Sequence, residues 1–299
     1  MKILLTGSSG LIGQALIPVL TSGGHRVVSL VRFKPQGGEP LVYWDPAGGD
    51  IDAAKLEGFE AVVHLAGEPI TGRWTAAKKR AIRDSRVNST RLLCETLARL
   101  ASRPRVLVAA SASGYYGDRG EEVLKEESEA GSSFLSRLCK DWEAATKPAA
   151  ERGIRVVNLR IGFVLSSAGG GLAKMLPAFK MGAGGKLGSG KQYMSWIALD
   201  DLAQIILFAA TTEGLNGPAN TVAPNPVTNL VFTKTLGRVL GRPAIFPMPA
   251  FAVRLAFGEM GEELLLASAR VEPARLLNAG YRFRFPELEP ALRYLLGRG

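Results

Sequence analysis

The stretch "KILLTGSSGLIGQAL" runs from Lys2 to Leu16 and predicts the start of an α/β fold. Its first part, residues 2–6, is a short apolar run typical of a strand buried on both faces. The second part has apolar residues at helical spacing, and glycines fill the junction: Gly7, Gly10 and Gly13. Such glycines let the backbone turn, approach a pyrophosphate and pack the helix against the strand. We therefore expect a phosphate-binding loop with the backbone of Leu11 and Ile12 at the start of the helix.

The chain up to about residue 168 alternates between apolar strands and amphipathic helices. We expect strands at 25–32, 41–44, 61–67, 105–112 and 154–165, with long helices at 75–102 and 132–143. This alternation implies right-handed crossovers and a Rossmann-type, doubly wound parallel sheet. From about Gly169 the alternation gives way to helices and turn-rich loops, which predicts a smaller, mostly helical C-terminal lobe. The expected division is a dinucleotide-binding domain at 1–168 plus about 198–212, and a substrate-side lobe at 169–197 and 213–299.

The end of the second strand indicates which dinucleotide is bound. A carboxylate at this place would accept hydrogen bonds from the ribose 2′-OH of NAD and repel a 2′-phosphate. The strand "VVSLVR" ends instead in Arg32. A guanidinium can bind a phosphate through two parallel hydrogen bonds and stack on adenine. The alternative is an ordinary surface arginine at a strand end, and the prediction is NADP(H).

Composition and charge exclude several classes of protein. The chain has 299 residues, of which 46% are hydrophobic and 21% charged, as in a globular protein with a full core. No apolar run approaches the roughly 20 residues that span a bilayer, and the N-terminus does not resemble a signal peptide. We therefore expect a cytoplasmic protein in which Cys94 and Cys139 are buried thiols. Two histidines and no Cys/His cluster argue against a metal site.

The net charge of +10 is concentrated in one part of the chain. Between Arg73 and Arg105 there are ten basic residues and two acidic ones, which could mark a nucleic-acid or membrane surface. No aromatic interleaving or DNA-reading motif accompanies them. We therefore expect neither a nucleic-acid nor a membrane partner, but a solvated helix face that attracts a polyanionic small molecule. The sequence leaves a homodimer open.

The spacing G-x-x-G-x-x-G resembles that of the short-chain dehydrogenase/reductase superfamily in its extended form. The segment "HLAGE" (64–68) is similar to the part of that superfamily that passes the adenine ribose, which implies cofactor contacts at Leu65, Ala66 and Gly67. His64 is expected to be a strand histidine whose ring is hydrogen-bonded.

Further pieces resemble one branch of this superfamily, the "epimerase family protein" set that ends in a C-terminal domain of unknown function. They include "RWTAAKKRAIRDSRVNST", "SASGYYG", "FLSRLCKDWE" and "FRFPELEPALR", and the resemblance covers essentially the whole chain. It implies that Arg86 approaches the cofactor from the long helix and that Val164 lies beside the nicotinamide end. Ala198 stands where the branch usually has histidine.

The superfamily usually carries a tyrosine and, one helical turn later, a lysine that together exchange a proton with the substrate. Here Leu135 and Cys139 occupy these two positions. The resemblance places Ser111 where a serine orients the substrate oxygen. Just beyond it, Tyr115 and Tyr116 could supply the missing acid, or could serve packing or as a lid.

Two hypotheses remain at this point. The first is an NADP(H)-dependent oxidoreductase or epimerase-like enzyme acting on a small, unidentified carbonyl or hydroxyl compound. The second is a non-catalytic NADP(H) sensor or partner protein, for example in cell division.

Two further parts of the chain carry expectations about structure. Glu143 is expected to support the structure around it. The glycine-rich segment 182–197 is expected in the lobe, either ordering over the cofactor or forming a surface loop.

Overall fold

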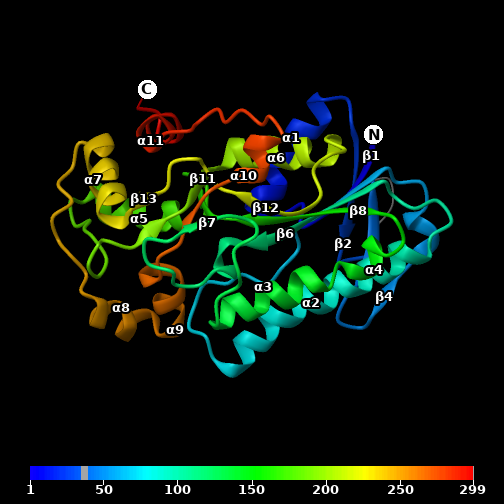
Figure 1. The fold of residues 1–299 in the computed structure, drawn as a ribbon, viewed down its shortest axis with the longest axis horizontal. Helices are drawn as coiled ribbons and strands as arrows, with labels where there is room; N and C mark the ends of the chain where they lie inside the picture. The colour runs from blue at the N-terminus through cyan, green and yellow to red at the C-terminus, as the bar shows by residue number, and fades with distance from the viewer. Residues whose placement is uncertain (35–39, 299) are drawn as a thin grey trace.

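An eight-stranded sheet forms the centre of the computed structural model, which describes residues 1–34 and 40–298 (Figure 1). In spatial order the strands are β12 (Gly217–Thr221), β8 (Arg155–Ile161), β6 (Val106–Ala112), β5 (Ala61–His64), β1 (Lys2–Thr6), β2 (Arg26–Val31), β3 (Leu41–Asp45) and β4 (Asp50–Ile51). Neighbouring strands are parallel except β3 and β4, which are antiparallel. The predicted doubly wound parallel sheet is confirmed.

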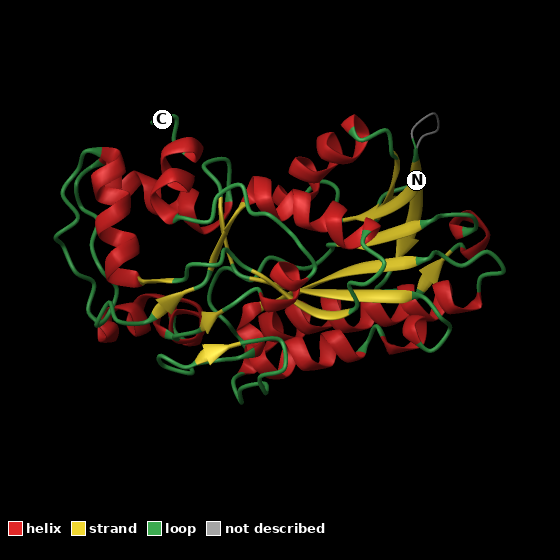
Figure 2. Cartoon of the chain, turned by 45° about the horizontal axis from the view of Figure 1, so that its top comes forward, coloured by secondary structure: helices red, strands yellow, loops and turns green. Residues whose placement is uncertain are grey.

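Helices cover both faces of this sheet (Figure 2). One layer contains α1 (Leu11–Ser22) and α6 (Leu199–Thr211), and the other contains α2 (Ala76–Arg99), α3 (Phe134–Ala144) and α4 (Lys147–Ala150). Successive side chains of a strand point to opposite faces, so β1 contributes to both cores. Ile3 and Leu5 belong to the same buried cluster as Leu16 of α1, whereas Leu4 belongs to the cluster that includes Leu93 of α2.

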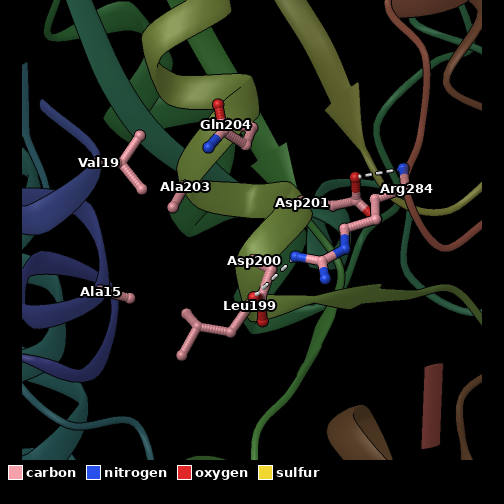
Figure 3. A pocket seen from close by; sticks show the side chains of 8 residues that line it. All are labelled: Ala15, Val19, Leu199, Asp200, Asp201, Ala203, Gln204 and Arg284. Carbon is pink, nitrogen blue, oxygen red and sulfur yellow. Dashed lines mark hydrogen bonds and ion pairs between the residues drawn. The ribbon is translucent and has the colours of Figure 1, made fainter. Parts of the chain in front are cut away.

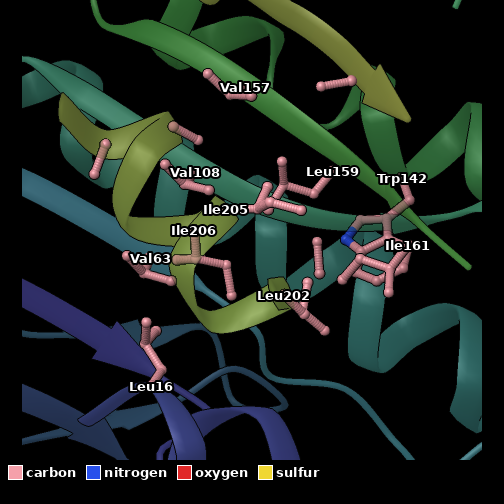
Figure 4. Packing of buried hydrophobic residues seen from close by; sticks show 14 of the residues in the cluster. Leu16, Val63, Val108, Trp142, Val157, Leu159, Ile161, Leu202, Ile205 and Ile206 are labelled. Carbon is pink, nitrogen blue, oxygen red and sulfur yellow. The ribbon is translucent and has the colours of Figure 1, made fainter. Parts of the chain in front are cut away.

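The helix α6 belongs to the core of the sheet although it follows part of the C-terminal lobe in the chain. Its side chains Leu202, Ile205 and Ile206 face the apolar side chains of β5, β6 and β8 (Figure 4). All three are fully buried. The structure therefore closes one face of the sheet with a helix from the second half of the chain.

Two elements differ from the sequence prediction. Residues 217–221, which we expected in the lobe, form β12 at the edge of the central sheet, where they pair only with β8. The strand expected at 154–165 is divided at Gly162 into β8 and β9 (Phe163–Leu165). A Cβ at Gly162 would lie 2.4 Å from the carbonyl oxygen of Ser195, so the chain bends where another backbone crosses it.

The C-terminal lobe has its own apolar core and several short strand pairs. Its helices are α5 (Gly170–Lys180), α7 (Asn229–Leu240), α8 (Ala250–Phe257), α9 (Glu259–Gly261), η3 (Glu262–Leu266), α10 (Ala274–Asn278) and α11 (Leu288–Leu295). Its strand pairs are β10 (Tyr193–Met194) with β13 (Val227–Thr228), β11 (Trp196–Ala198) with β9, and β14 (Arg270–Val271) with β7 (Val123–Leu124). The predicted helical lobe is confirmed.

A buried carboxylate joins this lobe to the sheet domain. Asp201 in the first turn of α6 accepts hydrogen bonds from the backbone N–H groups of Arg284 (2.8 Å) and Phe285 (2.9 Å) and from the hydroxyl of Tyr281 (3.1 Å). Its three donors compensate for the loss of water around the carboxylate.

Among the helices that the structure describes, none combines the length and the apolar character that a membrane span requires. Both cysteines are buried and free, as expected.

Shortening a buried side chain of α6 should destabilise the fold. We expect Ile205→Ala to lower the free energy of unfolding by about 2 to 5 kcal/mol, because it leaves a cavity between α6 and the sheet. Leu255→Ala is the matched control, since Leu255 is 84% exposed, and should change the value by less than about 0.5 kcal/mol. Urea unfolding followed by circular dichroism measures both, and equal losses would contradict this description of the core.

Candidate functional site

The predicted cofactor residues meet where the strand order reverses. The chain leaves β1 through α1 to reach β2 on one side, while β5 lies on the other side. Ligands of open α/β sheets bind in the crevice outside the carboxyl ends of the strands at such a point. Gly7 follows β1, Arg32 follows β2 and Leu65 follows β5, so all three lie at this edge.

The glycine loop is packed too closely for side chains. Gly7 has a φ of +73°, and a Cβ there would lie 2.8 Å from the carbonyl carbon of Leu65. A Cβ at Gly13 would lie 2.3 Å from the carbonyl oxygen of Gly7. Gly10 donates its N–H to that same oxygen at 3.0 Å. The three glycines thus bring the end of β1, the start of α1 and the segment after β5 into backbone contact.

The first turn of α1 presents free donors. Gly10 precedes the helix without a side-chain cap, and the first turn has no acidic residue. In the described ranges 1–34 and 40–298, the N–H groups of Leu11, Ile12 and Gly13 donate to no protein oxygen. Unpaired N–H groups and the positive end of the helix dipole favour an anion at this position.

One carboxylate on the β5 side of the crevice is bonded to one cation and lies within the electrostatic influence of two others. Glu68 accepts a hydrogen bond from Nζ of Lys78 at 2.7 Å. This hydrogen bond lowers the pKa of Glu68, and the charges of Lys78, Arg32 and Arg86 lower it further. Arg32 is exposed and makes no ion pair within the part of the chain that the structure describes. The surroundings of Glu68 therefore carry a net positive charge.

A buried hydroxyl fixes the segment after β5. Thr6 Oγ1 accepts hydrogen bonds from the N–H groups of Leu65 and Ala66, each at 3.1 Å. Both lone pairs of the hydroxyl are then used, so its proton points to Nδ1 of His64 at 2.8 Å. The predicted cofactor segment is thereby held against β1.

His64 continues the same network into α2 and α3. Since Nδ1 accepts from Thr6, Nε2 carries the ring proton and donates to Oγ1 of Thr90 at 2.9 Å. Thr90 also accepts from Nε1 of Trp142 at 3.0 Å. The ring is fully buried, and this burial lowers the pKa of His64 from 6.5 to about 4. The prediction of a hydrogen-bonded strand histidine is confirmed.

Ser111 is bound to a buried ion pair. Its hydroxyl donates to Oε1 of Glu143 at 2.7 Å. Arg160 binds both carboxylate oxygens of Glu143, through Nε and Nη2, each at 2.9 Å. The side chains of Arg160 and Glu143 are only 3% and 13% exposed, so each charge depends on the other. Glu143 supports its neighbours, as the sequence led us to expect.

The two tyrosines after β6 have different surroundings. Tyr115 ends the short helix η2 (Ser113–Tyr115) and is half-buried, with its ring centroid 3.4 Å from Cζ of Arg160. No hydrogen bond to its hydroxyl occurs among the described residues. Tyr116 is fully buried, and its hydroxyl accepts from Nη1 of Arg160 at 3.0 Å and lies 2.6 Å from Oδ1 of Asn220. Burial raises the pKa of Tyr116 to about 12.

The positions that usually hold the tyrosine and lysine are buried in α3. Leu135 packs so close to Gly114 that a Cβ at that glycine would lie 3.2 Å from Leu135 Cβ. Burial raises the pKa of the Cys139 thiol to about 12. The thiol is therefore protonated at neutral pH and carries no charge.

Val164 lies near the start of α1, whereas the segment 182–197 lies in the lobe. A Cβ at Gly170 would lie 3.4 Å from the side chain of Leu11 and 3.9 Å from the carbonyl oxygen of Val164. Val164 in β9 pairs with Ile197 in β11. The segment 182–197 is bonded to the rest of the lobe, because Gln192 donates to the carbonyl oxygen of Leu265 at 3.1 Å and the N–H of Leu187 donates to Oδ1 of Asn229 at 2.8 Å.

Sequence reasoning missed Arg160, which links Ser111, Tyr115 and Tyr116 through its contacts. One signal could have revealed it, since Arg160 is a lone charge in the apolar run "VVNLRIGFVL". A charge in a buried strand needs a partner. The partner, Glu143, lies 17 residues away in another element.

Comparison with known proteins places the chain in a family. Residues 3–222 match the family described as NAD dependent epimerase/dehydratase, and residues 248–295 match a domain of unknown function. The chain belongs to the NAD-dependent epimerase/dehydratase family. The resemblance found in the sequence is confirmed, including its C-terminal domain.

Similar proteins of this family span the full length of the chain. Epimerase family protein Mb2239 of Mycobacterium bovis is 44% identical over 297 residues, covering 99% of this chain and 98% of the relative. The crystal structure of human epimerase family protein SDR39U1 with NADPH is 35% identical, has a TM-score of 0.91 and covers 99% of both chains. A nucleoside-diphosphate sugar epimerase of Corynebacterium glutamicum is 39% identical with a TM-score of 0.81, over 99% of this chain and 58% of that one.

A separate groove of about 360 Å³ lies between α1 and α6 (Figure 3). Its lining is partly charged, with Arg284 Nη1 3.7 Å from Oδ1 of Asp200. It is lined by Ala15, Val19, Leu199, Asp200, Asp201, Ala203, Gln204 and Arg284. None of these belongs to the glycine loop or to the predicted catalytic residues, so the groove is distinct from the crevice.

The buried His64 should make stability depend on pH. The unfolded chain binds a proton at this ring below about pH 6.5, whereas the folded chain does so only below about pH 4. The free energy of unfolding should therefore fall by about 3 kcal/mol from this residue as the pH is lowered through that window. His64→Gln should flatten this part of the curve in urea unfolding measured at a series of pH values. An unchanged slope would contradict the neutral, buried ring.

Proposed function

We propose that the chain binds NADP(H) in the crevice between β1 and β5. The pyrophosphate would lie at the free N–H groups of Leu11 and Ile12, and Arg32 would bind the 2′-phosphate. The unpaired first turn of α1 carries this proposal, because its free N–H groups favour an anion and no protein group supplies one among the described residues. The human relative whose crystal structure contains NADPH supports it.

Replacing Arg32 tests the choice of cofactor. We expect wild type to bind NADPH more tightly than NADH in calorimetry. Arg32→Ala should reduce that preference by about tenfold or more, because it removes a charge-assisted hydrogen bond to the 2′-phosphate. Arg26→Ala is the matched control, since Arg26 is an exposed arginine at the opposite end of β2. Equal affinity of wild type for the two nucleotides would contradict the assignment.

For the reaction, we propose reduction of a small carbonyl compound, or its reversal, by an oxidoreductase of the extended short-chain dehydrogenase/reductase type. NADPH would supply the hydride to the carbonyl carbon. Tyr115 would give its hydroxyl proton to the carbonyl oxygen, and Ser111 would orient that oxygen once its hydroxyl turns from Glu143 to donate to it. The free hydroxyl of Tyr115 and the guanidinium of Arg160 against its ring support this choice. The hydroxyl of Tyr116 is already engaged with Arg160 and Asn220.

A second candidate function is a non-catalytic NADP(H) sensor or partner protein. The observation that favours it is the pair Leu135 and Cys139, which places no ionised group where the superfamily usually has its tyrosine and lysine. Such a protein would use the crevice for binding alone.

Screening separates the two candidates. NADPH oxidation against a library of small carbonyl compounds should reveal turnover by wild type and by Tyr116→Phe, but Tyr115→Phe should be slower by about 100-fold or more because it lacks the proton donor. Tight NADPH binding without turnover of any compound would favour the sensor. Turnover that survives in Tyr115→Phe would remove this tyrosine from the reaction.

Several expectations stay predictions. From the sequence we propose a cytoplasmic location and no nucleic-acid partner, and the sequence leaves a homodimer open. So is the division into a cofactor-binding domain and a substrate-side lobe, with β12 now placed in the sheet.

A further inference from the structure

The most exposed apolar side chains of the chain lie on one part of the C-terminal lobe. Among the side chains that the structure describes, only four large apolar ones are more than 70% exposed: Met181, Ile245, Phe251 and Leu255. Phe246, beside the second of them, is 60% exposed. We call these five side chains the apolar surface. Single exposed apolar side chains are ordinary, but several large ones on neighbouring segments mark an interaction site.

Neighbouring segments of the lobe carry the apolar surface. The chain before α8 runs beside the loop after α5, since the N–H of Phe246 donates to the carbonyl oxygen of Gly184 at 3.1 Å. It then leads directly into α8, where Phe251 and Leu255 lie one turn apart on the same face. Of the side chains of this helix only Val253 is buried. Figure 1 shows α8 at the outer end of the lobe, so one face of this helix is left without a partner within the described chain.

Positive charge accompanies the apolar surface. Residues 169–197 and 214–258 contain eight lysines and arginines and neither aspartate nor glutamate. Two of the eight form ion pairs with carboxylates elsewhere, and the other six form none within the part of the chain that the structure describes. Lys180, Lys186 and Arg242 are among these six and lie on the same segments as the apolar surface. A partner with negative charge is therefore favoured.

Charge and side-chain type select among the possible occupants. A second copy related by a two-fold axis would bring the same cations against each other, which is unfavourable. An anionic lipid surface would match the charge, but the aromatic side chains of the apolar surface are phenylalanines, whereas membrane interfaces favour tryptophan and tyrosine. An acidic segment of another protein meets both requirements, because it can offer carboxylates to the cations and apolar side chains to the exposed face of α8.

We propose that the apolar surface binds an acidic, amphipathic segment of a partner protein. The apolar side chains of that segment cover Phe251 and Leu255, and its carboxylates bind the three unpaired cations. Both covered residues belong to the domain of unknown function, residues 248–295, and neither belongs to the cofactor crevice. The inference therefore goes beyond the proposed function and does not depend on NADP(H) binding.

Selection from a library of random peptides displayed on phage tests this with the full chain. The library is first depleted on Phe251→Ala/Leu255→Ala and then selected on wild type. We expect the enriched peptides to combine aspartate and glutamate with apolar residues. In fluorescence anisotropy, an enriched peptide should bind Leu255→Ala about tenfold more weakly than wild type, because a leucine side chain is no longer buried. Lys180→Glu should also weaken binding, by about fivefold, through charge repulsion.

Two matched variants serve as controls. Leu277→Ala shortens another exposed leucine, 48% exposed at the end of α10. Lys140→Glu reverses the charge of another exposed lysine, in α3. Both variants should bind the peptide like wild type. Circular dichroism confirms that every variant is folded.

The other occupants give different results. Enriched peptides without acidic residues, no enrichment over the depleted variant, or wild-type affinity in Leu255→Ala would overturn the proposal. Sedimentation of wild type but not of Leu255→Ala with phosphatidylglycerol vesicles would assign the surface to a membrane instead. A dimer of wild type in analytical ultracentrifugation that Leu255→Ala dissociates would assign it to a second copy.

Discussion

The crevice depends on backbone contact between three segments that are far apart in sequence. Gly7 lies against Leu65 and Ala66, and Gly13 lies against Gly7, at distances that exclude a Cβ. Thr6 then joins the first two segments through its hydroxyl. This packing leaves the first N–H groups of α1 free at the carboxyl edge of the sheet. The backbone packing holds these N–H groups in position before an anion binds, and this reduces the entropic cost of binding.

Arginines around this edge differ in how their charge is balanced. Arg160 is neutralised by Glu143, which also accepts a hydrogen bond from Ser111, and Arg160 contacts both tyrosines. Arg32 and Arg86 have no such partner within residues 1–34 and 40–298. The paired Arg160 therefore positions its neighbouring side chains, whereas the unpaired Arg32 and Arg86 are available to a ligand. A chain without the usual tyrosine and lysine thus still carries unpaired positive charge at this edge, as far as the described residues show.

The parts of the structure that depend on local sequence could be predicted. The glycine loop, the order of strands and helices, and the residues Gly7, Arg32 and Leu65 at one edge follow from spacing and alternation. The tertiary contacts could not, because Glu143 and Arg160, or Tyr116 and Asn220, meet only after the sheet has formed. The strand-like segment "GPANT" was assigned to the lobe, because only its pairing with β8 in the folded chain shows that it is the edge strand β12 of the sheet. Likewise, Gly162 divides a predicted strand because another backbone crosses it.

A crystal structure of the chain grown with NADPH would test the central claim most directly. We expect density for the pyrophosphate within hydrogen-bond distance of the N–H groups of Leu11 and Ile12. We also expect the 2′-phosphate against the guanidinium of Arg32. An empty crevice at saturating NADPH, or one filled by the protein's own side chains, would contradict it.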